Sequence, residues 1–291
     1  MIRIILMIFG GFAAAAALLV LSVYWRSEAR LRDYETPPPF TAEIPTDAAS
    51  LEKGKHITRT RGCFGCHGQE LEGRDFSDMW DWAKRPVAPN LARVVQENGA
   101  SALEAAIRHG VGTDGRAMYS MPSYNWSHLT DDDLAALIGY LRTVPVSDKK
   151  LPKGQLGWSL RWRLIYEDDP TAADLATMVP PLRYSDADDP VLRHGEYLAM
   201  TMCNECHGFD LRGDQVFGNT PDLAMVAGYE LEDFTKLMRD CEPIGGPRDI
   251  GLMGLVCGDR FYALTDTEVS DLHAFLSTLY LEPVPENVGW R

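Results

Sequence analysis

The hydropathy pattern begins with an uncharged run from Ile4 to Trp25. As a helix, this run of 22 residues would be about 33 Å long, enough to cross the hydrocarbon core of a membrane. An arginine stands next to each end, and Tyr24 and Trp25 occupy the place of an interfacial aromatic belt. We therefore predict a transmembrane anchor at residues 1–27. The alternative is a signal peptide cleaved near Ser27-Glu28-Ala29, and the apolar run is long for one.

Two later segments share a polar cap followed by an apolar helical face. Thr130 is an expected N-cap with Asp133 three residues on, and Thr265 with Glu268 forms an expected capping box. Helical spacing then places apolar residues on one face of each segment. These residues are Leu134, Leu137, Ile138 and Leu141 before Pro145 in the first segment, and Val269, Leu272, Phe275, Leu276 and Leu279 in the second. No strand alternation stands out, so we predict an all-α fold.

Composition divides the chain after the anchor. Residues 28–47 are proline-rich and predict a stiff, extended spacer. The two capped helices close a first domain at 48–147 and a second at 188–291. The segment between them, 148–187, contains the stretch Trp158–Tyr166, which is too apolar for a free linker. We expect it to pack across both domains or against a partner.

A five-residue motif occurs once in each predicted domain. It reads Cys63-Phe-Gly-Cys66-His67 in the first and Cys203-Asn-Glu-Cys206-His207 in the second. Cys-x-x-Cys-His attaches haem c: the thiols bond the two vinyl groups and the histidine ligates the iron. A zinc site would need two close pairs building one tetrahedral centre, and a thioredoxin-like site would need a βαβ setting. Two complete copies favour two covalently bound haem c groups.

Two methionines stand at matching places downstream of the motifs. Met121 follows Pro89 by 32 positions, and Met253 follows Pro221 by the same 32 positions. A methionine on the far face of a His-ligated haem raises its potential and suits electron transfer. We therefore predict His67 and Met121 as iron ligands in the first domain, and His207 and Met253 in the second. The alternatives are Met118, and the histidines His109, His128 and His273.

The repeat is interrupted by two insertions. The first domain has eight extra residues around Trp80 and Trp82, and the second has three next to Cys257. Cys241 and Cys257 are the cysteines that the motifs leave over, and an even pair in an oxidising compartment predicts a disulfide. Since c-type haem is attached on the periplasmic side of the cytoplasmic membrane, both domains are expected there, on a single-pass anchor.

Charge is uneven along the chain, whose net formal charge is −14. Residues 48–147 carry 12 acidic and 11 basic residues, whereas residues 188–291 carry 19 acidic and 7 basic ones. The strongly negative second domain argues against nucleic acid and favours a basic docking partner. Acidity that serves only solubility is the alternative.

The motifs, the Pro-Asn-Leu turn after Val87, the Met121-Pro-Ser loop and the terminal helix together resemble class I cytochrome c domains. The resemblance implies that the first and last helices of each domain cross at a glycine and an aromatic residue. It also implies that a proline carbonyl orients each histidine ligand. The matching residues are Gly54 with Tyr140 and Pro89 in the first domain, and Gly195 with Phe275 and Pro221 in the second.

The stretches Tyr197–Asp214 and Asp249–Leu276 are also similar to cytochrome subunits of bacterial membrane-bound alcohol, gluconate or fructose dehydrogenases. Those subunits usually carry three haems and a C-terminal anchor, from which this chain departs. The resemblance implies an electron carrier rather than an enzyme, relaying electrons to or from a basic soluble cytochrome, a terminal oxidase or a dehydrogenase subunit of a respiratory chain. The alternatives are a dihaem peroxidase, and a structural electron-transfer subunit of a respiratory supercomplex.

Overall fold

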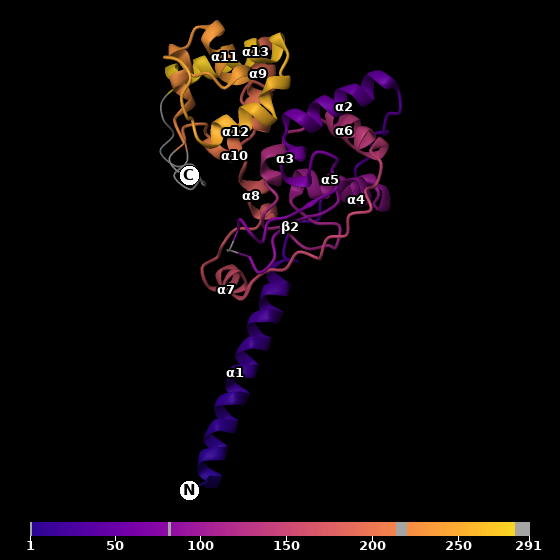
Figure 1. Cartoon of the computed structure of the whole chain (residues 1–291), viewed down its shortest axis with the longest axis vertical. Helices are drawn as coiled ribbons and strands as arrows, with labels where there is room; N and C mark the ends of the chain where they lie inside the picture. Colours follow the sequence, from indigo (N-terminus) through magenta and orange to yellow (C-terminus); the bar gives the residue numbers. More distant parts are fainter. Residues whose placement is uncertain (1, 81–82, 214–219, 283–291) are drawn as a thin grey trace.

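A computed structural model describes residues 2–80, 83–213 and 220–282. Trp82 and residues 283–291 of the predicted second domain lie outside the described residues. The elements in chain order are α1 (Ile2–Arg30), α2 (Ala48–Thr60), α3 (Cys63–His67), β1 (Arg74–Asp75), β2 (Val87–Ala88), α4 (Leu91–Glu97), α5 (Ala100–His109), η1 (Ser123–Trp126), α6 (Asp131–Thr143), α7 (Trp158–Tyr166), α8 (Ala172–Met178), α9 (Pro190–Met202), α10 (Asn204–His207), η2 (Leu223–Gly228), α11 (Leu231–Asp240), α12 (Leu252–Asp259), η3 (Phe261–Ala263), α13 (Asp266–Thr278) and η4 (Leu279–Leu281). Two groups of helices form a body from which α1 projects (Figure 1).

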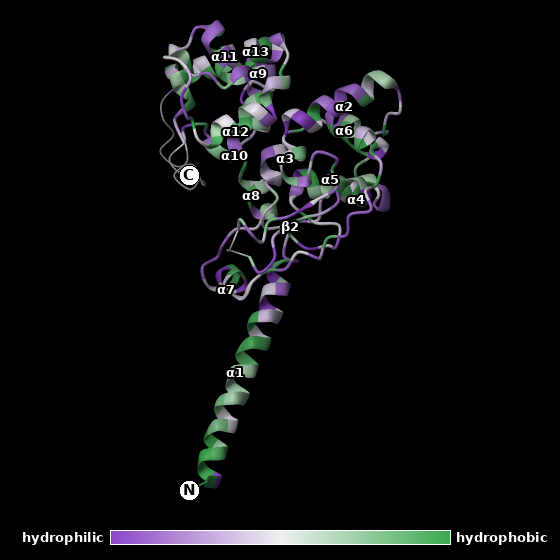
Figure 2. Cartoon of the chain, in the orientation of Figure 1, coloured by the Kyte–Doolittle hydropathy of each residue, from purple (hydrophilic) through white to green (hydrophobic). Residues whose placement is uncertain are grey.

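Helix α1 is apolar along most of its length and exposed, with its apolar residues running to the point where it enters the body (Figure 2). By length and composition it can cross a membrane, a property that signal sequences share. Only its last turns are buried, because Val23 and Ser27 lie one above the other at helical spacing and face the body. Arg30 then forms an ion pair with Asp174 of α8 at 2.7 Å.

The first core forms where α2 and α6 cross. Thr130 caps α6 by accepting a hydrogen bond from the N–H of Asp133, as predicted. The apolar face of α6 is fully buried, and α2 adds Ile57. The crossing is close because Gly54 of α2 has no side chain: a Cβ there would overlap the Ala136 carbonyl and lie 2.9 Å from Tyr140 Cβ. The predicted glycine–aromatic contact is confirmed here.

The second core repeats this arrangement with α9 and α13. Thr265 and Glu268 form the predicted capping box at the start of α13. A Cβ at Gly195 would overlap the Asp271 carbonyl and lie 2.6 Å from Phe275 Cβ, which again confirms the predicted crossing. Burial of α13 is complete at Leu272 and Phe275, and η2 and α11 close the remaining sides.

The all-α prediction misses one small feature. Arg74–Asp75 pairs antiparallel with Val87–Ala88, so β1 and β2 form a two-stranded sheet at the base of the first insertion. Each strand has two residues, too few to show an alternating pattern in the sequence. Phe76 stacks on Trp80 beside it, with ring centroids 4.1 Å apart.

The segment 148–187 packs against the rest of the protein and is not a free linker. Helix α7 lies along the buried end of α1, and α8 lies against α5 and η1. Leu175 of α8 forms one apolar cluster with Tyr124 and Phe209, while Leu182 and Tyr184 pack on the second core. This segment therefore connects α1 to the two cores through side-chain contacts.

The predicted disulfide is present between Cys241 and Cys257, and Cys257 is fully buried. It ties the end of α11 to α12 across 16 positions. We expect replacement of both cysteines by alanine to lower the free energy of unfolding by about 3 kcal/mol, because the bond restricts the unfolded chain. Urea unfolding of the full chain measures this effect. An unchanged unfolding midpoint would contradict it.

The two cores meet through contacts related by an approximate twofold exchange. His56 stands two residues after Gly54 and binds the Glu268 carboxylate at 2.8 Å. Tyr197 stands two residues after Gly195 and donates its hydroxyl to Asp133. Each core with its helices is one bundle. Asp133 and Glu268 are equivalent residues, because each stands three residues after the N-cap of its helix, α6 or α13. The first helix of each bundle therefore contacts the last helix of the other bundle through equivalent residues.

The His56–Glu268 contact should make the joint between the bundles sensitive to acid. Burial alone would raise the pKa of Glu268, but hydrogen bonds from His56 and the Thr265 backbone lower it to about 2 from an ordinary 4.5. A lowered carboxyl pKa contributes stability above 4.5, and the contribution is lost as pH falls from 4.5 towards 2. Thermal unfolding across that range should therefore be less pH-dependent in Glu268→Gln, which keeps the cap. Parallel pH profiles for the two proteins would contradict this.

Candidate haem-binding sites

The first motif forms α3, a short helix directly after α2. Gly62 precedes it with a positive φ of 81°, which permits the sharp turn between the two helices. His67 ends α3 and its Nδ1 donates to the Pro89 carbonyl at 2.9 Å, as the resemblance implied. This bond fixes the ring and leaves Nε2 as the metal-binding nitrogen.

The second motif has the same local geometry. Cys203 ends α9 and begins α10, and His207 Nδ1 lies 2.9 Å from the Pro221 carbonyl. Gly213 N–H also donates to the His207 carbonyl, as Gly73 N–H does to that of His67. The two motifs are therefore equivalent in backbone and in histidine orientation, although 214–219 are outside the described residues.

The motif side chains fit a covalently bound haem. Cys63, Cys66, Cys203 and Cys206 lie outside the disulfide, which uses Cys241 and Cys257. Burial raises the pKa of Cys63 and of Cys203 to about 12, against the lowering effect of nearby arginines. Burial also lowers the pKa of His67 and of His207, against the raising effect of the proline carbonyl, and so favours the neutral imidazole that ligates iron.

The donor set does not fit the zinc alternative. Within the described ranges, no cluster of three or more His, Cys, Asp and Glu side chains is arranged to hold a metal ion. The two cysteine pairs thus do not combine into one tetrahedral centre, which a structural zinc site would require.

Each predicted methionine ligand packs against the core that contains residues of its own motif. Met121 lies in the bend before η1 and packs on the cluster that contains Phe64, with Cys63 at its margin. Met253 lies on α12 and packs on the cluster that contains Cys203. Each methionine is half-buried, so its thioether lies at the edge of an apolar core rather than inside it.

The alternative histidine ligands are engaged elsewhere. His109 Nε2 binds Glu104, His128 Nε2 binds the Pro180 carbonyl, and His273 Nε2 binds the Tyr229 carbonyl, each at 2.8 Å. Met118 bonds to Gly110 and Ala172 through its backbone alone, which leaves its thioether available. The histidine contacts favour methionine ligands, and the choice of Met121 over Met118 stays a prediction.

Arg260 joins the two motifs across the boundary between the bundles. Its guanidinium lies against Gly62, which precedes Cys63, because a Cβ at that glycine would overlap it. The same guanidinium pairs at 3.5 Å with Glu205, the residue between Cys203 and Cys206. Arg260 therefore contacts both motif segments, and α3 and α10 lie near the boundary between the two bundles (Figure 1).

A second contact joins the methionine loop of the first bundle to the motif of the second. Tyr124 of η1 packs edge-on against Phe209, two residues after His207, with ring centroids 5.6 Å apart. Sequence analysis missed Arg260, Tyr124 and Phe209, because their partners are far away in the chain. The apolar character of Phe209 right after a motif was the only local signal.

Three buried polar side chains near these motifs have no hydrogen-bond partner among the residues that the structure describes. They are Asn125 and Trp126 on η1 and Asn204 inside the second motif. A buried N–H without a partner is costly, so each marks a place where another polar group would be stabilising. A haem carries propionate groups that could accept such bonds, which is consistent with haem at this boundary.

Known proteins resemble the chain in two ways. The cytochrome c family model matches residues 51–145, which include Cys63, Cys66, His67 and Met121. This region is therefore a cytochrome c domain, and a cytochrome c domain implies covalently bound haem c. The family match does not extend to the second motif.

Curated relatives align over more of the chain. The cytochrome c subunit of gluconate 2-dehydrogenase from Pantoea cypripedii is 25% identical over 180 residues, covering 57% of this chain and 40% of the relative. The cytochrome c subunit of quinone-dependent alcohol dehydrogenase from Gluconacetobacter polyoxogenes is 26% identical over 189 residues, covering 57% and 37%. The fructose dehydrogenase cytochrome subunit from Gluconobacter japonicus is 26% identical over 182 residues, covering 59% and 36%. The chain thus spans about two fifths or less of the length of these relatives.

Proposed function

We propose that this chain is a membrane-tethered dihaem cytochrome c, built of two cytochrome c domains in tandem. It relays electrons on the periplasmic side between a dehydrogenase or respiratory donor and a cytochrome or oxidase acceptor. The observation that carries the proposal is the juxtaposition of the two motifs across Arg260. Two redox centres exchange electrons quickly only when they are close, and this arrangement brings both attachment sites to one boundary.

Each set of residues has a defined role. The cysteine pairs would hold the porphyrin by thioether bonds, and His67 and His207 would bind the iron through Nε2, because their Nδ1 atoms are held by proline carbonyls. Met121 and Met253 would also bind the iron, and a methionine ligand would raise its potential. Haem c, when bound, supplies a one-electron Fe(III)/Fe(II) couple. The protein contributes the orientation of these ligands.

An equilibrium redox titration of the purified full chain tests the proposal, with haem absorption followed against potential. We expect two haems per chain and two high-potential waves. Replacement of Cys203 and Cys206 by alanine should remove one wave and one haem. A single haem in the unaltered chain would refute the dihaem assignment. A second wave at a strongly negative potential would favour the peroxidase alternative over the electron carrier.

The partner is proposed to dock on the second domain. Its excess of acidic residues favours a basic carrier, and the relatives, which are subunits of dehydrogenases, favour a dehydrogenase as the other partner. Neutralising exposed acidic side chains such as Glu232 and Asp266 should weaken the salt dependence of electron exchange with a basic cytochrome. An unchanged salt dependence would remove this part of the proposal.

A further inference from the structure

Helix α7 is apolar on two opposite sides. Leu160 and Leu164 face the protein and are fully buried. Trp158, Trp162 and Tyr166 follow one another at four-residue spacing, so they form a stripe on the other side, and they are 46%, 38% and 47% exposed. We name these three residues the aromatic stripe. A surface helix normally turns charged residues to water, so an outward aromatic row indicates a further contact.

The position of α7 along α1 identifies the level of that contact. Arg161 binds Ser27 at 2.6 Å and Glu28 at 2.9 Å. Its guanidinium also lies 4.3 Å from the Tyr24 ring. Helix α7 is therefore held level with the end of the uncharged run, beside the point where α1 leaves the body (Figure 1).

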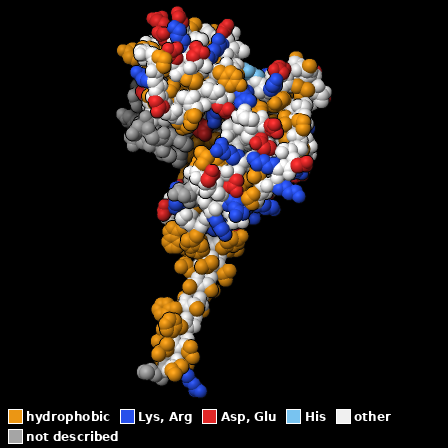
Figure 3. All heavy atoms as spheres, viewed as in Figure 1, with side chains coloured by type: hydrophobic (Ala, Val, Ile, Leu, Met, Phe, Trp, Pro, Cys, Tyr) orange, Lys and Arg blue, Asp and Glu red, His pale blue; other side chains and the backbone are white. Residues whose placement is uncertain are grey.

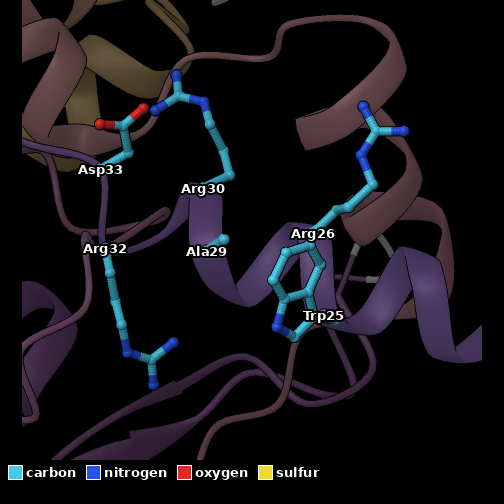
Figure 4. Close-up of a pocket in the computed structure, with 6 residues that line it drawn as sticks. All are labelled: Trp25, Arg26, Ala29, Arg30, Arg32 and Asp33. Atoms are coloured by element: carbon cyan, nitrogen blue, oxygen red, sulfur yellow. The ribbon is translucent and has the colours of Figure 1, made fainter.

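Basic groups lie beside the stripe, and the acidic Glu167 and Asp168 follow its last residue. Arg26 is exposed and lies over the Tyr166 ring, 5.5 Å from its centroid. Lys84 and Arg85 are exposed and adjoin the start of α7, where Gln155 pairs with Arg85. A hollow of about 480 Å³ opens beside the last turns of α1, lined by Trp25, Arg26, Ala29, Arg30, Arg32 and Asp33. Its arginines project around the helix end (Figure 4).

The outer surface shows the same order of side chains. Hydrophobic side chains cover α1 up to the base of the body, and lysine and arginine side chains gather just above that level (Figure 3). Aromatic residues at the membrane surface, with basic residues beside them, match a headgroup layer that is apolar below and anionic above.

We propose that α7 is an interfacial helix whose aromatic stripe lies in the lipid headgroup layer. This inference rests on the proposed membrane anchoring by α1 and goes beyond it. An anchor of one helix leaves the body free to tilt and rotate about it. A second contact through α7, joined rigidly to α1 by Arg161, fixes which face of the two cores points away from the membrane. A protein partner or a second copy on the stripe is the competing occupant.

Spin labels on single introduced cysteines test the proposal in the haem-loaded full chain. In that chain the motif thiols are bonded to haem and Cys241–Cys257 is oxidised, so an added cysteine is the reactive one. The chain is reconstituted in vesicles of phosphatidylcholine and phosphatidylglycerol. Labels at Trp162→Cys and Tyr166→Cys are then compared by their collisions with oxygen, which concentrates in lipid, and with a water-soluble nickel chelate. Ser159→Cys is a third label site on α7. Ser159 is exposed and next to Trp158, so this label reports the position of α7 while all three aromatic residues remain in place.

Two controls bracket the measurement. Leu255→Cys on α12, 72% exposed and remote from α1, should report water. Leu18→Cys within α1, 67% exposed, should report lipid. We expect labels on α7 to show a several-fold higher oxygen-to-nickel ratio than Leu255→Cys.

Each other outcome overturns the inference in a recognisable way. Labels on α7 that match Leu255→Cys, with Leu18→Cys in lipid, would refute the interfacial helix and leave the anchor standing. Labels on α7 shielded from both reagents would assign the stripe to a protein contact. Leu18→Cys in water would refute the anchor itself, and the inference with it.

Discussion

Replacement of Met121 by histidine is expected to lower one of the two haem potentials by on the order of 0.2 V, because the axial ligand sets haem potential over a range of about 0.8 V. The other potential should change little, since Met253 belongs to the other core. The two waves of the redox titration would then separate widely. Exchange between the haems would become strongly one-directional, which stopped-flow reduction can follow.

The matched control is Met118→His, three residues earlier in the same loop. Met118 is held by its backbone bonds to Gly110 and Ala172, and its Cγ lies beside Gly112. We expect its titration to equal that of the unaltered chain. If Met118→His moved a wave and Met121→His moved neither, the ligand assignment made from the 32-residue spacing would be wrong. Met253→His should shift the wave that Met121→His leaves in place.

Local signals predicted the parts of the site that depend on neighbours in the chain. The motif spacing, the caps at Thr130 and Thr265, and the leftover pair Cys241–Cys257 are each short-range constraints, and the structure contains the caps and the disulfide. The glycine crossings were also accessible, because a family resemblance named the glycine and the aromatic together. The motifs and the caps each depend on residues within one short stretch of sequence.

Long-range pairs could not be predicted in this way. His56 and Glu268 are 212 positions apart, and Gly62 and Arg260 are similarly distant. Nothing in the sequence around a single histidine or arginine specifies which remote residue it contacts. The twofold exchange between the bundles depends on how two complete surfaces fit together. The stretch Trp158–Tyr166 was recognised as too apolar for a linker, but only its packing on α1 separates the buried leucines from the exposed aromatic stripe.

Insertion of a single methyl group at Gly195 is expected to destabilise the second bundle, although glycine-to-alanine changes inside helices usually stabilise. In Gly195→Ala the new Cβ would overlap the Asp271 carbonyl oxygen and lie 2.6 Å from Phe275 Cβ. Both neighbours belong to the backbone or the stem of α13, so neither can rotate away. Alanine gains about 1 kcal/mol over glycine in helix propensity, whereas overpacking of a rigid crossing costs roughly 3 kcal/mol or more. The steric term therefore wins, and we expect a net destabilisation of about 2 kcal/mol.

Urea unfolding of the haem-loaded chain, followed by fluorescence and by haem absorption, measures this loss. Gly228→Ala is the control, because a Cβ there meets nothing within 4 Å. Helix α9 runs directly into Cys203, so a shift of α9 away from α13 also moves the second attachment site. The variant should therefore lose second-haem occupancy during maturation while the first haem is retained. Equal stability and equal haem content in Gly195→Ala and Gly228→Ala would show that α9 and α13 do not cross this closely. The second bundle would then differ from the first in how its first and last helices cross. The dihaem proposal, which depends on the two bundles being equivalent, would lose that support.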